Sequence, residues 1–135
     1  MTARKPARKR VLVVDDDRGL NHVLVEMLRE SGVDAAGVGD GLSAVRRLEK
    51  EKFHLVLLDI GLPKMDGLTL CKKLRTVAST AQIPVGFLTA QVGPESYKEA
   101  AKAGSLLYMP KPFKPERLVS FVHVLLSSAR KAKQV

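Results

Sequence analysis

The sequence predicts an α/β fold in which five parallel strands form one doubly wound sheet with helices on both faces. Short aliphatic runs of strand length alternate with segments whose apolar residues recur at helical spacing, which favours parallel strands joined by right-handed crossovers. Two runs, residues 11–14 and 55–58, are aliphatic throughout, as is typical of central strands buried on both faces. We therefore expect the strand order 2-1-3-4-5 and a functional edge between the first and third strands.

The strands are predicted from short aliphatic runs that end at polar residues or at turn-forming glycines and prolines. The second is the weakest and is expected near an edge of the sheet. The fifth runs into a rigid Pro-Lys-Pro turn at residues 110–112. The predicted strands cover residues 11–14, 33–38, 53–58, 84–88 and 106–109.

The helices are predicted from apolar residues spaced three and four apart. Gly32 ends the first helix and Gly104 the fourth, whereas Pro115 begins the fifth. Cys71 lies on the apolar face of the third helix, so we interpret it as a core thiol rather than a reactive one. The residues expected to face the core from the first and last helices are Leu20, Val23, Leu24, Met27, Leu28, Leu118, Phe121, Val122, Leu125 and Leu126.

Composition excludes several classes of protein. At 135 residues the chain is long enough for one domain with a full core. Its single cysteine cannot form an intramolecular disulfide, and nothing resembles a thiolate metal site. No apolar run approaches membrane-spanning length or forms a signal peptide. We expect a cytoplasmic protein that does not associate with membranes.

The positive charge is concentrated at the two ends of the chain. Of 23 lysines and arginines, eight lie in the first ten and last six residues, which leaves 15 basic against 14 acidic residues between them. We therefore divide the chain into a flexible basic tail at residues 1–9, a domain at 10–128 and a basic tail at 129–135. Contact with nucleic acid, an acidic partner or an anionic surface is the alternative interpretation, but neither tail interleaves aromatic residues with its charges, so we favour a solubilising role.

Three carboxylates are expected to meet at the carboxyl edge of the sheet. Asp15 and Asp16 follow the first strand and Asp59 follows the third. Carboxylates in a shared pocket repel one another, and a hard divalent cation with oxygen ligands such as Mg²⁺ relieves that repulsion. The alternative, an acidic run that only caps the next helix, fits Asp17 better than its two neighbours.

Two further strand ends add a hydroxyl and a cation. Thr89 follows the fourth strand and Lys111 the fifth. A metal ion, a lysine and a hydroxyl directed at one carboxylate are suited to stabilise a phosphoryl group in transfer. The pattern indicates that Asp59 is a nucleophile that carries the phosphoryl group as an acyl phosphate.

Four motifs extend this interpretation across the chain. They are Val-Val-Asp-Asp-Asp at 13–17, Leu-Leu-Asp-Ile-Gly-Leu-Pro-Lys-Met-Asp-Gly at 57–67, Phe-Leu-Thr-Ala at 87–90 and Lys-Pro-Phe at 111–113. With these motifs the chain resembles the receiver domains of two-component response regulators, of the single-domain chemotaxis type, from about residue 10 to residue 128. The resemblance implies the flavodoxin-like fold and a phosphorelay switch rather than a dedicated enzyme.

The resemblance also implies a role for each site residue. Asp59 would accept a phosphoryl group from a histidine kinase or phosphotransfer protein, with Mg²⁺ held by Asp15, Asp16, Asp59 and the carbonyl of Gly61. Thr89 and Lys111 would hold the phosphoryl oxygens, and the bond before Pro112 would be cis. Tyr108 would be an aromatic switch that changes the surface of the fourth helix, fifth strand and fifth helix, where a protein target or a second copy would bind. An exposed strand aromatic is the alternative for Tyr108.

Three functional hypotheses follow from these observations. The first is a stand-alone binding module, since few residues follow the last helix. The second is the receiver portion of a longer regulator or hybrid kinase, although Met1 argues against a missing N-terminal part. The third, a Mg²⁺-dependent phosphatase, is disfavoured because Gly61 occupies the place where a second acid is expected.

Overall fold

The computed structural model describes residues 8–90 and 93–134, and for residues 128–134 it describes only the backbone. Strands and helices alternate strictly, as predicted. The elements are β1 (Arg10–Val14), α1 (Arg18–Glu30), β2 (Asp34–Val38), α2 (Gly41–Lys50), β3 (Leu55–Asp59), α3 (Gly67–Thr76), β4 (Val85–Thr89), α4 (Pro94–Lys102), β5 (Leu107–Pro110) and α5 (Pro115–Gln134).

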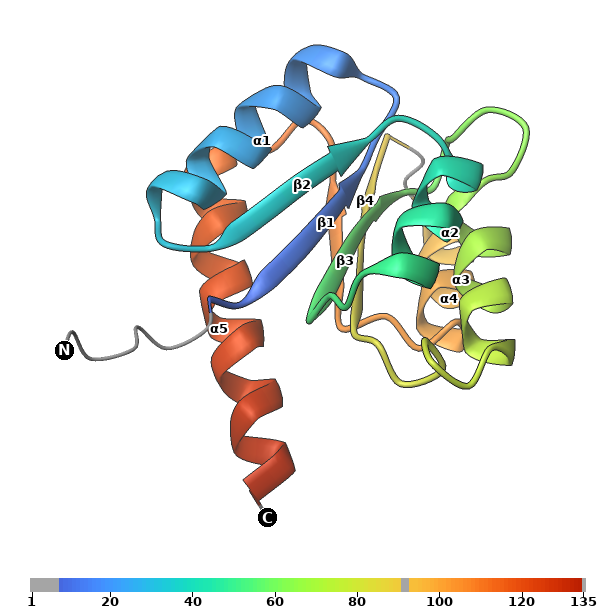
Figure 1. Ribbon diagram of the computed structural model, residues 1–135. Coiled ribbons are helices and arrows are strands. Elements are labelled where there is room, and N and C mark those ends of the chain that lie inside the picture. The colour runs from blue at the N-terminus through green and yellow to red at the C-terminus, as the bar shows by residue number, and fades with distance from the viewer. Residues whose placement is uncertain (1–7, 91–92, 135) are drawn as a thin grey trace, which may run out of the picture.

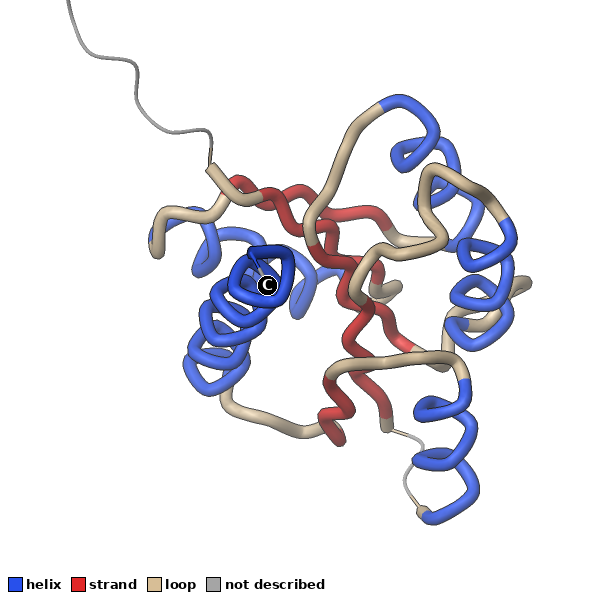
Figure 2. Tube along the Cα trace, turned by 90° about the horizontal axis from the view of Figure 1, so that it is seen from below, coloured by secondary structure: helices blue, strands red, loops and turns tan. Residues whose placement is uncertain are grey.

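The five strands form one parallel sheet in the order β2-β1-β3-β4-β5, which confirms the predicted topology (Figure 1). Helices α1 and α5 cover one face, and α2, α3 and α4 cover the other (Figure 1 and Figure 2). The predicted weak strand, β2, lies at one edge, and β5 lies at the other. Because all strands run the same way, their carboxyl ends meet along one edge of the sheet.

An apolar cluster lies on each face of the sheet. On the α1 and α5 face, Val11 and Val13 of β1 pack with Leu24 and Leu118. On the other face, alternate residues of the same strand pack against α2 and α3. Cys71 is buried there, and its thiol lies 3.3 Å from the carbonyl oxygen of Ala103. Its side chain is fully buried, which confirms that Cys71 is a core residue, and this burial raises the pKa of the thiol.

Aspartates cap the three helices that begin at the carboxyl edge after β1, β2 and β3. Asp17 accepts a hydrogen bond from the backbone N–H of Leu20, and Asp40 accepts one from Ser43. Asp66 caps α3 in the same way. Such caps satisfy N–H groups that have no partner within the helix. Asp17 thus belongs to the helix cap, as its place in the acidic run predicted.

The last helix extends further than the sequence pattern indicated. Helix α5 continues to Gln134, through most of the segment that we set apart as a basic tail, and projects past the amino edge of the sheet (Figure 1). Residues 1–7 of the other tail lie outside the described residues. Among the described residues, no helix has the length and apolar character needed to cross a membrane.

Candidate functional site: a carboxylate cluster at the sheet edge

The predicted carboxylate cluster forms where β1 and β3 end side by side. Val14 of β1 pairs with Leu58 of β3, so the residues that follow, Asp15 and Asp59, are neighbours across the sheet. Each of Asp15, Asp16 and Asp59 offers a carboxylate oxygen, and these three atoms lie within 4.8 Å of one another. Asp15 and Asp59 are buried, whereas Asp16 is exposed. The cluster therefore opens to solvent on the side of Asp16.

Lys111 bridges the two buried carboxylates. Its Nζ lies 2.8 Å from Oδ2 of Asp15 and 3.2 Å from Oδ2 of Asp59. Its backbone N–H donates to the carbonyl of Thr89 at 2.7 Å, and its bond to Pro112 is cis, as expected. Burial lowers the pKa of the Lys111 ammonium, but the hydrogen bond and the charges from the two aspartates outweigh it and raise that pKa. Lys111 thus remains a fixed cation.

The ionised carboxylate of Asp15 is destabilised by its surroundings in the cluster. Burial raises the pKa of its carboxyl group, and the charge of Asp59 acts in the same direction. The hydrogen bonds from Lys111 and from the backbone N–H of Asp17, at 2.9 Å, oppose this rise without cancelling it. The ionised form of Asp15 is therefore less stable in the folded protein than in the unfolded chain.

This balance predicts that Asp15→Asn stabilises the metal-free protein. Because the folded carboxyl holds its proton more tightly, its ionisation lowers the free energy of unfolding as pH rises from about the ordinary value of 3.8 to the raised folded pKa. The urea midpoint of the variant should exceed that of wild type at pH 7 in EDTA, and the difference should shrink towards pH 4. Excess Mg²⁺ should reduce or reverse the difference. Urea midpoints that differ by the same amount at pH 4 and at pH 7 would contradict the prediction.

Gly61 and Thr89 complete the immediate surroundings of Asp59. The backbone N–H of Gly61 donates to Oδ1 of Asp59 at 3.0 Å, which fixes the carboxylate beside the turn that carries the Gly61 carbonyl. Thr89 ends β4, the strand next to β3, and is fully buried. Asp59, Thr89 and Lys111 therefore come from the ends of three successive strands, as the sequence predicted.

Tyr108 lies further from the cluster, on the side of β5 that faces α4. Its hydroxyl and that of Ser96 on α4 are hydrogen bonded at 2.9 Å. Its ring meets that of Tyr97 edge to face, with 5.5 Å between centroids. These contacts with Ser96 and Tyr97 could not be predicted from the sequence, because no motif links residues of α4 and β5 that meet only through the packing of a helix on a strand.

The donor set fits a hard divalent cation. All three side chains offer carboxylate oxygens, the ligands that Mg²⁺ prefers. One ammonium, that of Lys111, contacts two of the three carboxylates, so the cluster keeps an excess of negative charge. With a divalent cation bound, the same site can receive an anionic group beside Asp59, next to the Lys111 ammonium and to Thr89 at the end of β4.

Comparison with known proteins places this site in a known family. The family model described as response regulator receiver domain matches residues 11–123. The chain is 39% identical over 119 residues to the DNA-binding response regulator MtrA of Mycolicibacterium paratuberculosis, covering 88% of this chain and 52% of that protein. It is 36% identical over 124 residues to the transcriptional regulatory protein RprY of Bacteroides fragilis, covering 92% and 52%. The chain thus spans about half the length of these relatives.

Solved structures agree in fold. The receiver domain of the Francisella response regulator 1452 superposes with a TM-score of 0.83 at 30% identity, covering 90% of this chain and 99% of that one. A CheY-like receiver domain protein from Methanospirillum hungatei gives a TM-score of 0.86 at 26% identity, covering 93% and 99%. The flavodoxin-like topology expected from the sequence is therefore confirmed.

Proposed function

This chain belongs to the response regulator receiver domain family, and from that premise we propose that Asp59 accepts a phosphoryl group from a histidine kinase or phosphotransfer protein. Receiver domains are signalling domains rather than dedicated enzymes. The observation that carries the proposal is the bridging of buried Asp15 and Asp59 by Lys111 beside exposed Asp16. This arrangement places one nucleophilic carboxylate next to a fixed cation and an opening to solvent.

In the proposed reaction a carboxylate oxygen of Asp59 forms a bond to phosphorus as the bond from phosphorus to the donor nitrogen breaks. The donor imidazole leaves with the electron pair, and an acyl phosphate remains on Asp59. Mg²⁺ held by Asp15, Asp16, Asp59 and the Gly61 carbonyl would neutralise charge on the phosphoryl oxygens. The N–H of Gly61 holds Oδ1 of Asp59, which limits the orientations that the nucleophile can adopt.

Lys111 and Thr89 have separate roles in this proposal. Before phosphorylation the ammonium of Lys111 already lies 3.2 Å from Oδ2 of Asp59, so it can pass from the carboxylate to a phosphoryl oxygen with little movement. The Thr89 hydroxyl at the next strand end would donate to another phosphoryl oxygen. Both interactions are charge-assisted, and such hydrogen bonds are about twice as strong as neutral ones.

Phosphorylation would act on Tyr108 through Thr89. An aspartyl phosphate adds roughly one to two negative charges at the end of β3, which would draw Thr89 towards Asp59. Tyr108 is half-buried, and its hydroxyl is hydrogen bonded to that of Ser96 on α4. We infer that it turns inward into the space that Thr89 leaves, with loss of that bond and of the contact with Tyr97.

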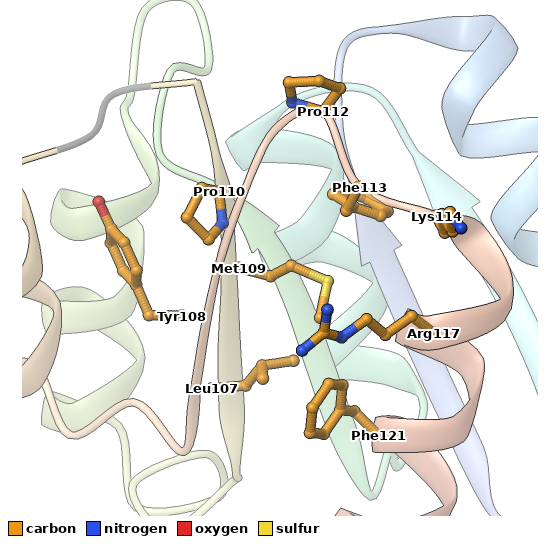
Figure 3. A pocket seen from close by; sticks show the side chains of 9 residues that line it. All are labelled: Leu107, Tyr108, Met109, Pro110, Pro112, Phe113, Lys114, Arg117 and Phe121. Carbon is orange, nitrogen blue, oxygen red and sulfur yellow. The ribbon is translucent and has the colours of Figure 1, made fainter.

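A groove between β5 and α5 supplies a surface for a protein target. The groove has a volume of about 550 Å³, and its lining includes Leu107, Met109 and Phe121 with the cations Lys114 and Arg117 (Figure 3). Tyr108 projects from the opposite side of β5 (Figure 3). No ion pair joins Lys114 or Arg117 to a carboxylate among the described residues. We propose that the target presents apolar side chains flanked by acidic ones.

Tyr108→Ala is expected to uncouple this surface from Asp59. With Mg²⁺ and beryllofluoride, a mimic of the phosphoryl group, amide NMR shifts near Asp59 and Thr89 should match those of wild type. The shifts at Leu107 and Arg117 should fall to less than about half of their wild-type size, because the ring that moves in the wild-type protein is absent. Tyr97→Ala, which removes the other ring of the pair, is the control and should keep them. Wild-type shifts in the Tyr108 variant would exclude Tyr108 from the switch.

The proposed function is tested by phosphoryl uptake. Wild-type protein incubated with a small-molecule phosphodonor and Mg²⁺ should gain the mass of one phosphoryl group, and EDTA should prevent the gain. An absence of uptake with Mg²⁺ present would contradict the proposal. Steady release of phosphate from a generic phosphomonoester would instead support the phosphatase hypothesis.

A further inference from the structure

Asn21 lies on the first turns of α1, and its side-chain amide is close to the backbone turn that carries Asp15 and Asp16. Its Nδ2 is 2.9 Å from the carbonyl oxygen of Val38, 3.0 Å from that of Asp15 and 3.5 Å from that of Val13. Three surrounding acceptors identify the nitrogen end of the amide, since the oxygen would be repelled there. Asn21 thus joins α1 to the carboxyl ends of β1 and β2.

Gly37 provides the space that this amide occupies. A Cβ atom at Gly37 would lie 2.0 Å from Oδ1 of Asn21 and 3.1 Å from a methyl carbon of Val25. The backbone of Gly37 does not adopt a left-handed conformation, so the requirement for glycine is one of space. Gly39, two residues further on, has no atom within 4 Å of its Cβ position. Only one of these two glycines is therefore needed to seat Asn21.

The bonds of Asn21 act on the turn that carries two of the clustered carboxylates. The N–H of Asp15 donates to Val38 at 3.2 Å, and the N–H of Asn21 donates to Asp17 at 2.9 Å. The amide adds a bond to the Asp15 carbonyl, so the turn is held to β2 and to α1 at the same time. Mutual repulsion among the carboxylates acts to open the turn, and the Asn21 bonds oppose that movement.

We propose that Asn21, seated in the space left by Gly37, is a positioning residue for the Mg²⁺ site. The hydrogen bonds of its amide are to backbone carbonyls, so it fixes the backbone from which Asp15 and Asp16 project. The inference rests on the proposed function, because it assumes that the carboxylate cluster binds Mg²⁺. Replacing a group that orients metal ligands without itself binding the metal typically weakens metal affinity by about 10- to 100-fold.

The test is Mg²⁺ binding by calorimetry to the full chain without a phosphodonor. Asn21→Ala and Gly37→Ala should each bind Mg²⁺ about tenfold more weakly than wild type, the second because its methyl group displaces the amide. The double variant should bind no more weakly than Asn21→Ala, because both changes remove the same interaction. Gly39→Ala is the matched control and should bind as wild type does.

A purely structural role gives a different result. Loss of stability alone leaves the Mg²⁺ affinity unchanged while nearly all molecules remain folded, so urea denaturation of each variant separates the two effects. Wild-type affinity in Asn21→Ala and Gly37→Ala would overturn the inference, as would additive losses in the double variant. An absence of Mg²⁺ binding by wild type would instead overturn the proposed function on which the inference rests.

Discussion

Replacement of Asp59 by Asn is expected to abolish phosphoryl uptake from a small-molecule donor. The amide has no anionic oxygen to attack phosphorus, so no acyl phosphate can form. Its carbonyl oxygen can still accept the hydrogen bond that Gly61 donates to Oδ1, so the fold is expected to persist. Intact-protein mass spectrometry after incubation with donor and Mg²⁺ measures the loss, and circular dichroism confirms the fold.

Asp17→Asn is the matched control for this prediction. Asp17 lies in the same acidic run as Asp15 but caps α1 through Leu20, and Asn is as good a cap as Asp. The control should therefore take up phosphoryl groups as wild type does. Uptake by the Asp59 variant, or equal loss in both variants, would show that the nucleophile lies elsewhere.

Gly67→Ala is expected to lower the free energy of unfolding by about 3 kcal/mol, the upper end of the usual cost of overpacking. A Cβ atom there would lie 2.4 Å from the carbonyl oxygen of Asp59 and 2.9 Å from Cα of Ile60. Both are backbone atoms, and the N–H of Gly67 donates to Ile60 at 2.9 Å. The start of α3 must therefore move away from the end of β3, with loss of that bond.

Urea denaturation at pH 7 measures this change. Gly39→Ala is again the control, because its methyl group meets open space and should change stability by less than about 0.5 kcal/mol. The Gly67 variant should also bind Mg²⁺ more weakly, since the displaced segment includes Asp59. A stability within about 0.5 kcal/mol of wild type would show that α3 is not tightly seated on β3.

The sheet topology and the cluster could be predicted because both depend on local patterns. The aliphatic runs that became β1 and β3 are buried on both faces, and each delivers a carboxylate to the same edge. The strand order then makes Asp15 and Asp59 neighbours without any knowledge of side-chain packing. Lys111 and Thr89 followed from the same argument, applied to the ends of β5 and β4.

Element boundaries were less exact where packing decides them. We expected the third strand to begin at Phe53, but β3 begins at Leu55. Phe53 instead packs beneath the guanidinium of Arg10, whose central carbon lies 4.5 Å from the centroid of the Phe53 ring. This cation–π contact stabilises the segment that leads into β3. Hydrophobicity alone does not separate a residue in a strand from one that packs just before it.

The seating of Asn21 could not be predicted for a related reason. A polar residue near a helix start usually faces solvent, and Gly37 in a weak strand indicates only low strand propensity. Their contact depends on the rotation of α1 about its axis over β2. The helical state of residues 129–134 was also missed, because a basic segment without apolar periodicity gives no signal for a helix that continues from a packed one.

The most direct test of the central claim is the amide NMR spectrum of wild type with Mg²⁺ and beryllofluoride. We predict shifts around Asp59, Thr89 and Lys111 that spread to Tyr108 and to the groove between β5 and α5, and that are absent in Asp59→Asn. An unchanged spectrum, or equal shifts in the variant, would contradict a switch that depends on phosphorylation of Asp59.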